Sequence, residues 1–300
     1  MARYNAIPRT GHLQAMQRAF GYIKHYPKVS IQYDETMPDL TTHKLTTCDW
    51  EQFYPGLTEE LPPDMPTPKG NPARITGYFD ADHAGCLQTR RSVTGVIMFV
   101  NNTPIKWYSK RQNTVESSTY GSELVAGRIA TELAIEMRYK LRMVVIPLQG
   151  SCVLFGDNQS VVMNTTIPSS MPKKKHNAIA YHRVREAIAA RVIDVVHCRS
   201  KENLADIFTK ALGPMVHRGL LEWRGFPKLG KNEGEYQRDT AKHRGRPQTI
   251  FLHPTIGLCT RKSGAEKVDQ HWPTSLIMHT PPPHQTHPYT RTLFLCQQEA

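Results

Sequence analysis

Residues 74–82 read RITGYFDAD and combine an apolar segment with two closely spaced aspartates. It predicts a strand that ends at a turn near Ala84 and Gly85. Asp80 and Asp82 are two residues apart, so both side chains are expected on the same face of that strand. A carboxylate at the end of an apolar strand is costly unless it is paired or binds a cation. Taken alone, however, the two aspartates are better explained as solvated acids in a turn.

The segments that follow alternate between strand and helix patterns. SVTGVIMFV at 92–100 and PIKWYS at 104–109 predict two more strands, joined by a hairpin turn at Asn101 and Asn102. Three consecutive strands, followed by helices that alternate with strands, predict an α/β fold with a mixed sheet and helices on its faces. The remaining expected elements are a long helix over 118–143, a strand over 151–157 with a short helix after it, a basic helix over 174–190, a strand over 192–198 and a helix over 202–212.

Two further acids stand near predicted helix starts. Glu123 lies in the first turns of the long helix, and its spacing from Ala126 and Ala130 places it on the face that packs against the sheet. Favourable placement of an acid near a helix N-terminus explains its position along the helix, but not its place on the apolar face. Asp157 follows an apolar strand and precedes a helix, so a helix N-cap explains it as well as a functional role does.

A fourth acid lies in the last predicted helix. Leu204 and Ile207 belong to its apolar side, and Asn203, Asp206 and Lys210 lie together on another side. The ordinary explanation of such a polar side is that it faces the solvent.

None of the four acids indicates a metal site when taken alone, but the four together do. The ends of the first and fourth strands can be neighbours, and the helix starts can point to the same edge of the sheet. Carboxylates gathered in one cleft repel one another, and hard divalent cations remove that repulsion. Mg²⁺ prefers oxygen ligands, with Mn²⁺ as the alternative, and two such ions about 4 Å apart can hold the attacking and leaving oxygens of a phosphodiester. The sequence therefore predicts that the catalytic metal ligands are Asp80, Glu123, Asp157 and Asp206, with Asp82 in reserve.

The composition of the chain agrees with a polyanionic partner. The chain has 300 residues, a formal net charge of +12 and 39% hydrophobic residues. This charge favours nucleic acid over a membrane, although a merely soluble basic protein would share it. No apolar run approaches the roughly 18 residues that span a bilayer, and MARYNAIPRT lacks the apolar stretch of a signal peptide. The six cysteines form no CxxC pair, so reduced thiols and an intracellular location are expected.

Three regions of the chain differ in composition and in hydrophobic periodicity. Residues 1–73 start with a helix pattern near Thr10 and a strand pattern at 29–33, and they end in a Pro-rich linker. Residues 74–213 hold the regular elements described above and are predicted as one domain. Residues 214–300 lose their periodicity and become rich in Pro and His, so a basic, disordered tail is predicted, with a metal-binding tail as the less favoured alternative.

The motifs of the middle region resemble the ribonuclease H region of copia-type LTR retrotransposon polyproteins. The opening PRTGHLQAMQRAFGYIKHY resembles the stretch just after the reverse transcriptase palm, so residues 1–73 are interpreted as a remnant of the C-terminal part of that enzyme. The chain contains no YxDD-type polymerase motif. The stretches that carry the ribonuclease H resemblance are, in order, YFDADHAG, RRSVTGVIMFVNNTPIKWYSKRQNTVESSTYGSELVA, DNQS, KKKHNAIAYHRVRE and NLADIFTK.

This resemblance implies a ribonuclease H-like fold, a five-stranded mixed sheet flanked by helices. It also implies Mg²⁺-dependent endonucleolytic hydrolysis of the RNA strand of RNA–DNA hybrids during reverse transcription. The polymerase part of the polyprotein is the implied partner, and the implied location is the cytoplasmic virus-like particle or the nucleus. The family's four acids match Asp80, Glu123, Asp157 and Asp206. The alternative is a catalytically weak or inactive remnant that only binds nucleic acid, and the order of the acids argues against an integrase-type nuclease.

Substrate binding is expected to come mainly from phosphate contacts of basic residues. Polar residues near the acids could contact the hybrid or its 2′-hydroxyl groups, which separate RNA from DNA. The alternative for the basic residues is a charge run that only keeps the protein soluble. The predicted nucleic-acid contacts are Ser117, Ser118, Asn158, Lys173, Lys174, Lys175, Arg183 and Arg185, with Arg90 and Arg91 as further candidates.

Overall fold

The structure is a computed structural model that describes residues 9–25, 31, 33–43, 45, 48–172 and 175–223. The chain divides into two units, Met1–Gly257 and Leu258–Ala300, and the second unit lies entirely outside the described residues. Of the region predicted as a tail, only residues 214–223 are described, so its predicted disorder stays a prediction.

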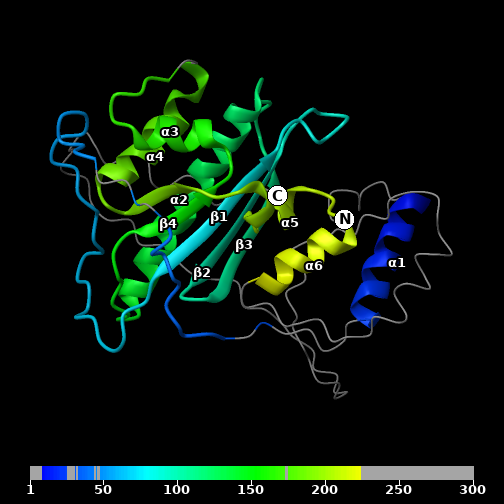
Figure 1. The fold of residues 1–300 in the computed structure, drawn as a ribbon, viewed down its shortest axis with the longest axis horizontal. Helices are drawn as coiled ribbons and strands as arrows, with labels where there is room; N and C mark the ends of the chain where they lie inside the picture. Colours follow the sequence, from blue (N-terminus) through cyan, green and yellow to red (C-terminus); the bar gives the residue numbers. More distant parts are fainter. Residues whose placement is uncertain are drawn as a thin grey trace, which may run out of the picture. The chain divides into compact units, whose positions relative to one another are not determined.

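Five strands form one mixed sheet in the order β3-β2-β1-β4-β5 (Figure 1). β1 pairs antiparallel with β2, and β2 pairs antiparallel with β3, whereas β4 lies parallel to both β1 and β5. The α/β fold class expected from the sequence, ribonuclease H-like with a five-stranded mixed sheet flanked by helices, is therefore confirmed. The strand bounds are Ile75–Asp82 (β1), Val93–Val100 (β2), Thr103–Arg111 (β3), Cys152–Gly156 (β4) and Ile193–His197 (β5).

Helices cover both faces of this sheet. In Figure 1, α2, α3 and α4 lie on one side of it, and α5 and α6 lie on the other. Among the described helices, none combines the length and the apolar content that crossing a bilayer requires. The α-helices are Thr10–His25 (α1), Thr119–Met143 (α2), Gln159–Thr166 (α3), Ala178–Ala189 (α4), Asp206–Thr209 (α5) and Pro214–Trp223 (α6), and short 3-10 helices cover Lys175–Asn177 (η2) and Ser200–Glu202 (η3).

The core has two halves because successive residues of a strand point to opposite faces of the sheet. In β1, Phe79 packs into the half formed with α2 and α4, and Tyr78 packs into the half formed with α5 and α6. On α2, the fully buried residues Ala126, Ala130 and Ala134 present only methyl groups. Such small side chains let this long helix lie close to the sheet, so its buried face is fixed in position.

Part of the region before β1 is attached to this domain. Trp50 belongs to the core half on the α2 side. The carboxylate of Glu59 pairs with Arg138 at 2.7 Å and also with Arg142, both on α2. The domain boundary at residue 73 stays a prediction, but the predicted linker is held against α2 by these contacts.

Two predicted elements are wrong in extent. The last predicted helix shrinks to α5, which ends at Thr209 because the backbone of the next residue, Lys210, is extended (φ −118°, ψ 150°). In the predicted strand at 29–33, Ile31 and Tyr33 are not in a strand, and the other residues lie outside the described ones. In addition, α6 forms in the region that was predicted as a tail.

Candidate active site

The site lies where β1 and β4 separate. The parallel pairing between these strands ends at Tyr78 and Phe155. Asp80 is therefore two residues beyond the last pair, and Asp157 directly follows the last residue of β4. Because β1 and β4 run in the same direction, their ends meet at one edge of the sheet, which brings Asp80 and Asp157 together.

Asp157 does not cap the helix that follows it. The N-cap of α3 is Asn158, whose side-chain oxygen accepts a hydrogen bond of 3.2 Å from the backbone N–H of Val161. The N-cap explanation of Asp157 is therefore wrong, and its carboxylate is left to the acid cluster.

The short helix α5 brings a third acid to the same place. Gly95 pairs with Asp80 across β1 and β2. A Cβ atom at Gly95 would lie 2.6 Å from Cγ2 of Thr209 and 2.7 Å from the carbonyl oxygen of Ala205. The glycine thus lets α5 rest directly on the sheet, with Asp206 beside Asp80.

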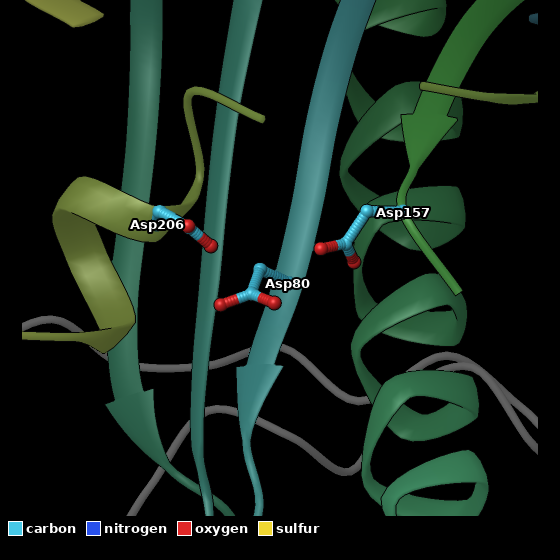
Figure 2. Close-up of side chains that lie close together, drawn as sticks. All are labelled: Asp80, Asp157 and Asp206. Carbon is cyan, nitrogen blue, oxygen red and sulfur yellow. The ribbon is translucent and has the colours of Figure 1, made fainter. Parts of the chain in front are cut away.

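Three carboxylates converge at this point (Figure 2). Asp80, Asp157 and Asp206 each offer an oxygen atom, and these atoms all lie within 4.8 Å of one another. Asp80 is 0% exposed, whereas Asp157 and Asp206 are half-buried. The structure therefore places three of the four predicted acids close together, and two of them are partly exposed to solvent.

The fourth acid, Glu123, reaches Asp80 from α2 and is 4% exposed. Burial, followed by the negative charges of Asp80 and Asp157, raises the pKa of Glu123 to about 10. Its Oε2 atom is buried and has no hydrogen-bond partner in the described part of the chain. Glu123 is outside the group of three aspartates, but the charges of Asp80 and Asp157 act on its carboxyl group.

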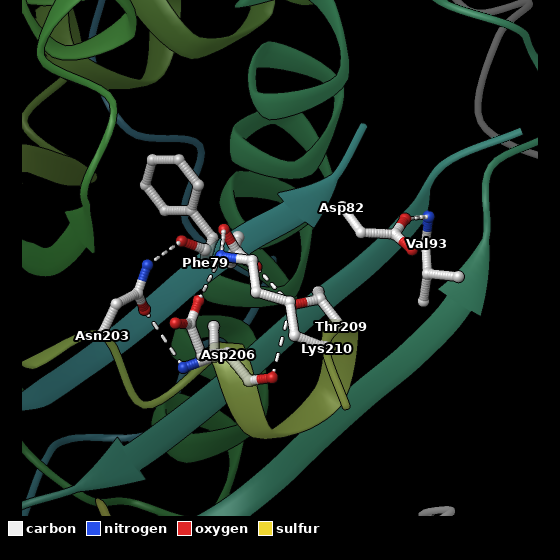
Figure 3. Close-up of polar contacts among 9 residues, drawn as sticks. Phe79, Asp82, Val93, Asn203, Asp206, Thr209 and Lys210 are labelled. Atoms are coloured by element: carbon white, nitrogen blue, oxygen red, sulfur yellow. Dashed lines mark hydrogen bonds and ion pairs between the residues drawn. The ribbon is translucent and has the colours of Figure 1, made fainter. Parts of the chain in front are cut away.

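Two donors at the end of α5 contact the acids (Figure 3). The hydroxyl of Thr209 donates to Oδ2 of Asp80, and Nζ of Lys210 lies 3.2 Å from the same oxygen and 2.7 Å from Oδ1 of Asp206. Burial acts to lower the pKa of Lys210, but the charges of Asp80 and Asp206 raise it above its usual range. Burial and the charge of Asp80 nevertheless raise the pKa of Asp206 to about 6. One lysine therefore does not neutralise the cluster.

The donor set fits a hard divalent cation. All four acids offer carboxylate oxygens, which are the ligands that Mg²⁺ and Mn²⁺ prefer. The raised pKa of Glu123 and its unpartnered oxygen are expected where acids are crowded without enough positive charge. Asp80, Asp157 and Asp206 could therefore hold a metal ion, with Glu123 next to it.

Asp82, the reserve ligand, is not part of the three-carboxylate group. One of its oxygens accepts a hydrogen bond from the backbone N–H of Val93, at the start of β2 (Figure 3). Asp82 therefore stabilises the connection between β1 and β2, although it shares a strand face with Asp80.

Arg185 is wrong as a predicted nucleic-acid contact. Its side chain is buried, and its guanidinium group donates hydrogen bonds to the carbonyl oxygens of Asn164, Ile167 and Pro168. It also lies 4.8 Å from the ring centroid of Trp50. Arg185 therefore holds the loop after α3 in place and is not presented to a ligand.

The other predicted contacts differ in their surroundings, and contact with nucleic acid stays a prediction for all of them. Ser118 caps α2 with its side chain, as Asn158 caps α3. Ser117, Lys175 and Arg90 are exposed, Arg183 and Arg91 are half-buried, and Lys173 and Lys174 lie outside the described residues.

Three site residues received no role from the sequence. Lys210 follows Asp206 by four residues, and this spacing could have indicated an ion pair. The contacts of Thr209 with Asp80 and of Asn203 with the carbonyl oxygen of Phe79 span more than 120 residues of sequence. No local pattern predicts contacts at that separation.

About half of the chain is similar to a region of retrotransposon Pol polyproteins, which confirms the copia-type resemblance. It is 30% identical over 164 residues to the retrovirus-related Pol polyprotein from transposon RE2 of Arabidopsis thaliana, covering 54% of this chain and 11% of that protein. It is 32% identical over 145 residues to the Pol polyprotein from transposon TNT 1-94 of Nicotiana tabacum, covering 48% of this chain and 11% of that protein. The chain thus spans about a tenth of the length of these curated relatives. No protein-family model matches the chain.

Solved ribonucleases H are also similar to this chain. The RNase H1 of Halobacterium salinarum matches at 16% identity and a TM-score of 0.36, over 45% of this chain and 94% of that one. LC11-RNase H1, solved in complex with an RNA/DNA hybrid, matches at 16% identity and a TM-score of 0.35, over 45% of this chain and 94% of that one. The fold described above rests on the strand order and pairing of this chain itself.

Proposed function

We propose that this chain is a retroelement ribonuclease H, which hydrolyses the RNA strand of RNA–DNA hybrids with the help of divalent cations. The observation that carries the proposal is the convergence of Asp80, Asp157 and Asp206 within 4.8 Å, with Glu123 beside them. The similarity to Pol polyproteins supports the choice of substrate. Polymerase activity is not proposed, because the chain contains no YxDD-type motif.

The acids have distinct tasks in this proposal. When bound, Mg²⁺ or Mn²⁺ would stabilise negative charge on the phosphate and lower the pKa of a water molecule. Asp80 is central, because it contacts Glu123 on one side and the Lys210–Asp206 pair on the other. The hydroxyl of Thr209 orients the carboxylate of Asp80 by a hydrogen bond. Asp157 and Asp206 are more open to solvent and complete the ligand set toward the substrate side.

The basic residues near α4 are proposed to bind the phosphates of the hybrid. Lys175 is exposed and Arg183 is half-buried, so both can reach a polyanion, and Lys173 and Lys174 extend the same run in sequence. Ser117, exposed just before α2, is proposed to approach a 2′-hydroxyl group. The polymerase part of a Pol polyprotein is the proposed partner that would add further contacts to the substrate.

A matched pair of variants tests this function. Asp157→Asn keeps the shape of a side chain in the acid cluster but removes its charge, and Asp82→Asn does the same outside the cluster while keeping the oxygen that accepts from Val93. We expect Asp157→Asn to reduce hybrid cleavage in Mg²⁺ at least roughly 100-fold, which is more than is usually lost when a residue that only orients a metal ligand is changed. Asp82→Asn should retain most activity. Equal activity of the Asp157→Asn variant and the unaltered chain would overturn the proposal.

A further inference from the structure

Positive charge is distributed unevenly around the acid cluster. On one side, Nζ of Lys210 lies 2.7 Å from Oδ1 of Asp206 and 3.3 Å from Oδ1 of Asp80. On the other side, Asp80 faces Glu123 and Asp157, and among the described residues no ion pair of a Lys or Arg with either of these two acids is found. The two sides of Asp80 therefore differ in whether a cation is already present.

The orphaned oxygen lies on the side that lacks this ammonium group. Oε2 of Glu123 is buried without a hydrogen-bond partner in the described part of the chain, although the residue is only 4% exposed. An unpartnered buried carboxylate oxygen is costly unless a cation or a donor completes it. The Asp80–Asp157–Glu123 side is therefore where the missing positive charge is expected.

The backbone of α5 fixes the position of Lys210. Lys210 is the C-cap residue of α5, and its backbone N–H donates to the carbonyl oxygen of Asp206 at 3.0 Å. Because α5 lies against Gly95, the lysine backbone is fixed over β1 and β2. Its side chain is still 40% exposed, so the ammonium group can move away into solvent without unfolding the helix.

We propose that Lys210 serves as a built-in monovalent cation on the Asp80–Asp206 side of the cluster. In this arrangement the chain binds one divalent ion tightly, between Asp80 and Asp157 and next to Glu123, while Asp206 stays paired with Lys210. A second divalent ion binds Asp80 and Asp206 only after it displaces the ammonium group of Lys210. The ion and the ammonium group are both positive and would repel each other strongly if both contacted these two acids. This inference rests on the proposed function, since it assumes that the acids form a divalent-cation site. It adds how many ions the site holds when no substrate is bound.

The test is a titration of the full chain with Mn²⁺, in which the unbound ion is followed by electron paramagnetic resonance. We expect the unaltered chain to bind one ion tightly and a second at least about tenfold more weakly, as the repulsion by Lys210 requires. Lys210→Met should tighten the second ion by about tenfold or more, whereas Lys210→Arg, which keeps the charge, should behave like the unaltered chain. Thermal unfolding of each variant without metal checks that the fold is intact.

The outcomes separate this inference from the proposed function. Two ions of equal affinity in the unaltered chain, unchanged in Lys210→Met, would overturn the role of Lys210 and leave the metal site standing. If the unaltered chain bound no ion tightly, the metal site would itself be wrong, and the role of Lys210 would fail with it. Loss of the tight ion in Asp157→Asn, but not in Lys210→Met, supports the assignment of that ion to the side of Asp157.

Discussion

The side-chain amide of Asn203 donates a hydrogen bond of 3.0 Å to the carbonyl oxygen of Phe79, the residue before Asp80. The side-chain oxygen of the same residue accepts a hydrogen bond of 3.1 Å from the backbone N–H of Ala205, the residue before Asp206. One buried side chain therefore connects the backbones that carry two of the acids, and it sets the spacing between β1 and α5.

Asn203→Ala is expected to lower the free energy of unfolding by about 1–3 kcal/mol, because it leaves two buried backbone groups without partners. It should also weaken divalent-cation binding, since Asp206 is no longer held beside Asp80. Urea unfolding and Mn²⁺ titration measure the two effects. Asn113→Ala, at an exposed position, is the control. Equal stability of both variants would contradict the bridging role of Asn203.

Gly95→Ala is expected to push α5 away from the sheet. The added methyl group would meet Thr209 and the carbonyl oxygen of Ala205 at less than ordinary contact distance. Such overpacking typically costs about 1–3 kcal/mol. The same change at Gly219 in α6 meets no atom within 4 Å and should be neutral or slightly stabilising. If Gly95→Ala left stability and Mn²⁺ binding unchanged, close packing of α5 would not be what positions Asp206.

The metal-free protein is expected to lose stability as pH rises. The pKa of Glu123 is raised to about 10 and that of Asp206 to about 6 when folded, so the folded state holds protons that the unfolded state releases. Between about pH 5 and pH 8, linkage therefore predicts a steady loss of stability, mostly from Glu123. Unfolding in the presence of a chelator measures this slope, and Glu123→Gln should flatten it. A stability that rises over this range would contradict the crowding of the acids.

Glu59 lies before the predicted domain boundary at residue 73, and we expect it to stabilise the domain that follows. Burial alone would raise the pKa of Glu59, but hydrogen bonds from Arg138 and Arg142 lower it to about 2. Its contribution is therefore complete above the pKa of the unfolded chain, near 4.5, and is lost as pH falls toward 2.

Glu59→Gln should lower the free energy of unfolding by about 3–5 kcal/mol at neutral pH, because two largely buried guanidinium groups lose their partner. Glu132→Gln removes an exposed pair with Arg128 on the same helix and should cost only about 0.3–0.5 kcal/mol. Similar losses in both variants would show that the segment before β1 is not anchored by this ion pair.

The sequence was informative where local patterns decide structure. Short segments that end at turn signals predicted β1 and β2, and helical spacing placed Glu123 on the buried face of α2, because these patterns depend only on neighbouring residues. It failed where tertiary contacts override local preference. The helical spacing over 202–212 continues past the end of α5, where the backbone of Lys210 is extended and its ammonium group contacts Asp80, 130 residues away in sequence. Arg185 reads as a surface charge in sequence, yet it is buried by contacts with the loop after α3.

In the proposed function, the acid cluster and a divalent cation together hydrolyse the RNA strand of a hybrid. The most direct measurement incubates the full chain with a hybrid labelled on both strands, and with a DNA duplex of the same sequence, in Mg²⁺ or in chelator. We expect internal cleavage of the RNA strand alone, only in Mg²⁺, with fragments that end in a 3′-hydroxyl and a 5′-phosphate. An intact hybrid in Mg²⁺, or equal cleavage in chelator, would contradict it.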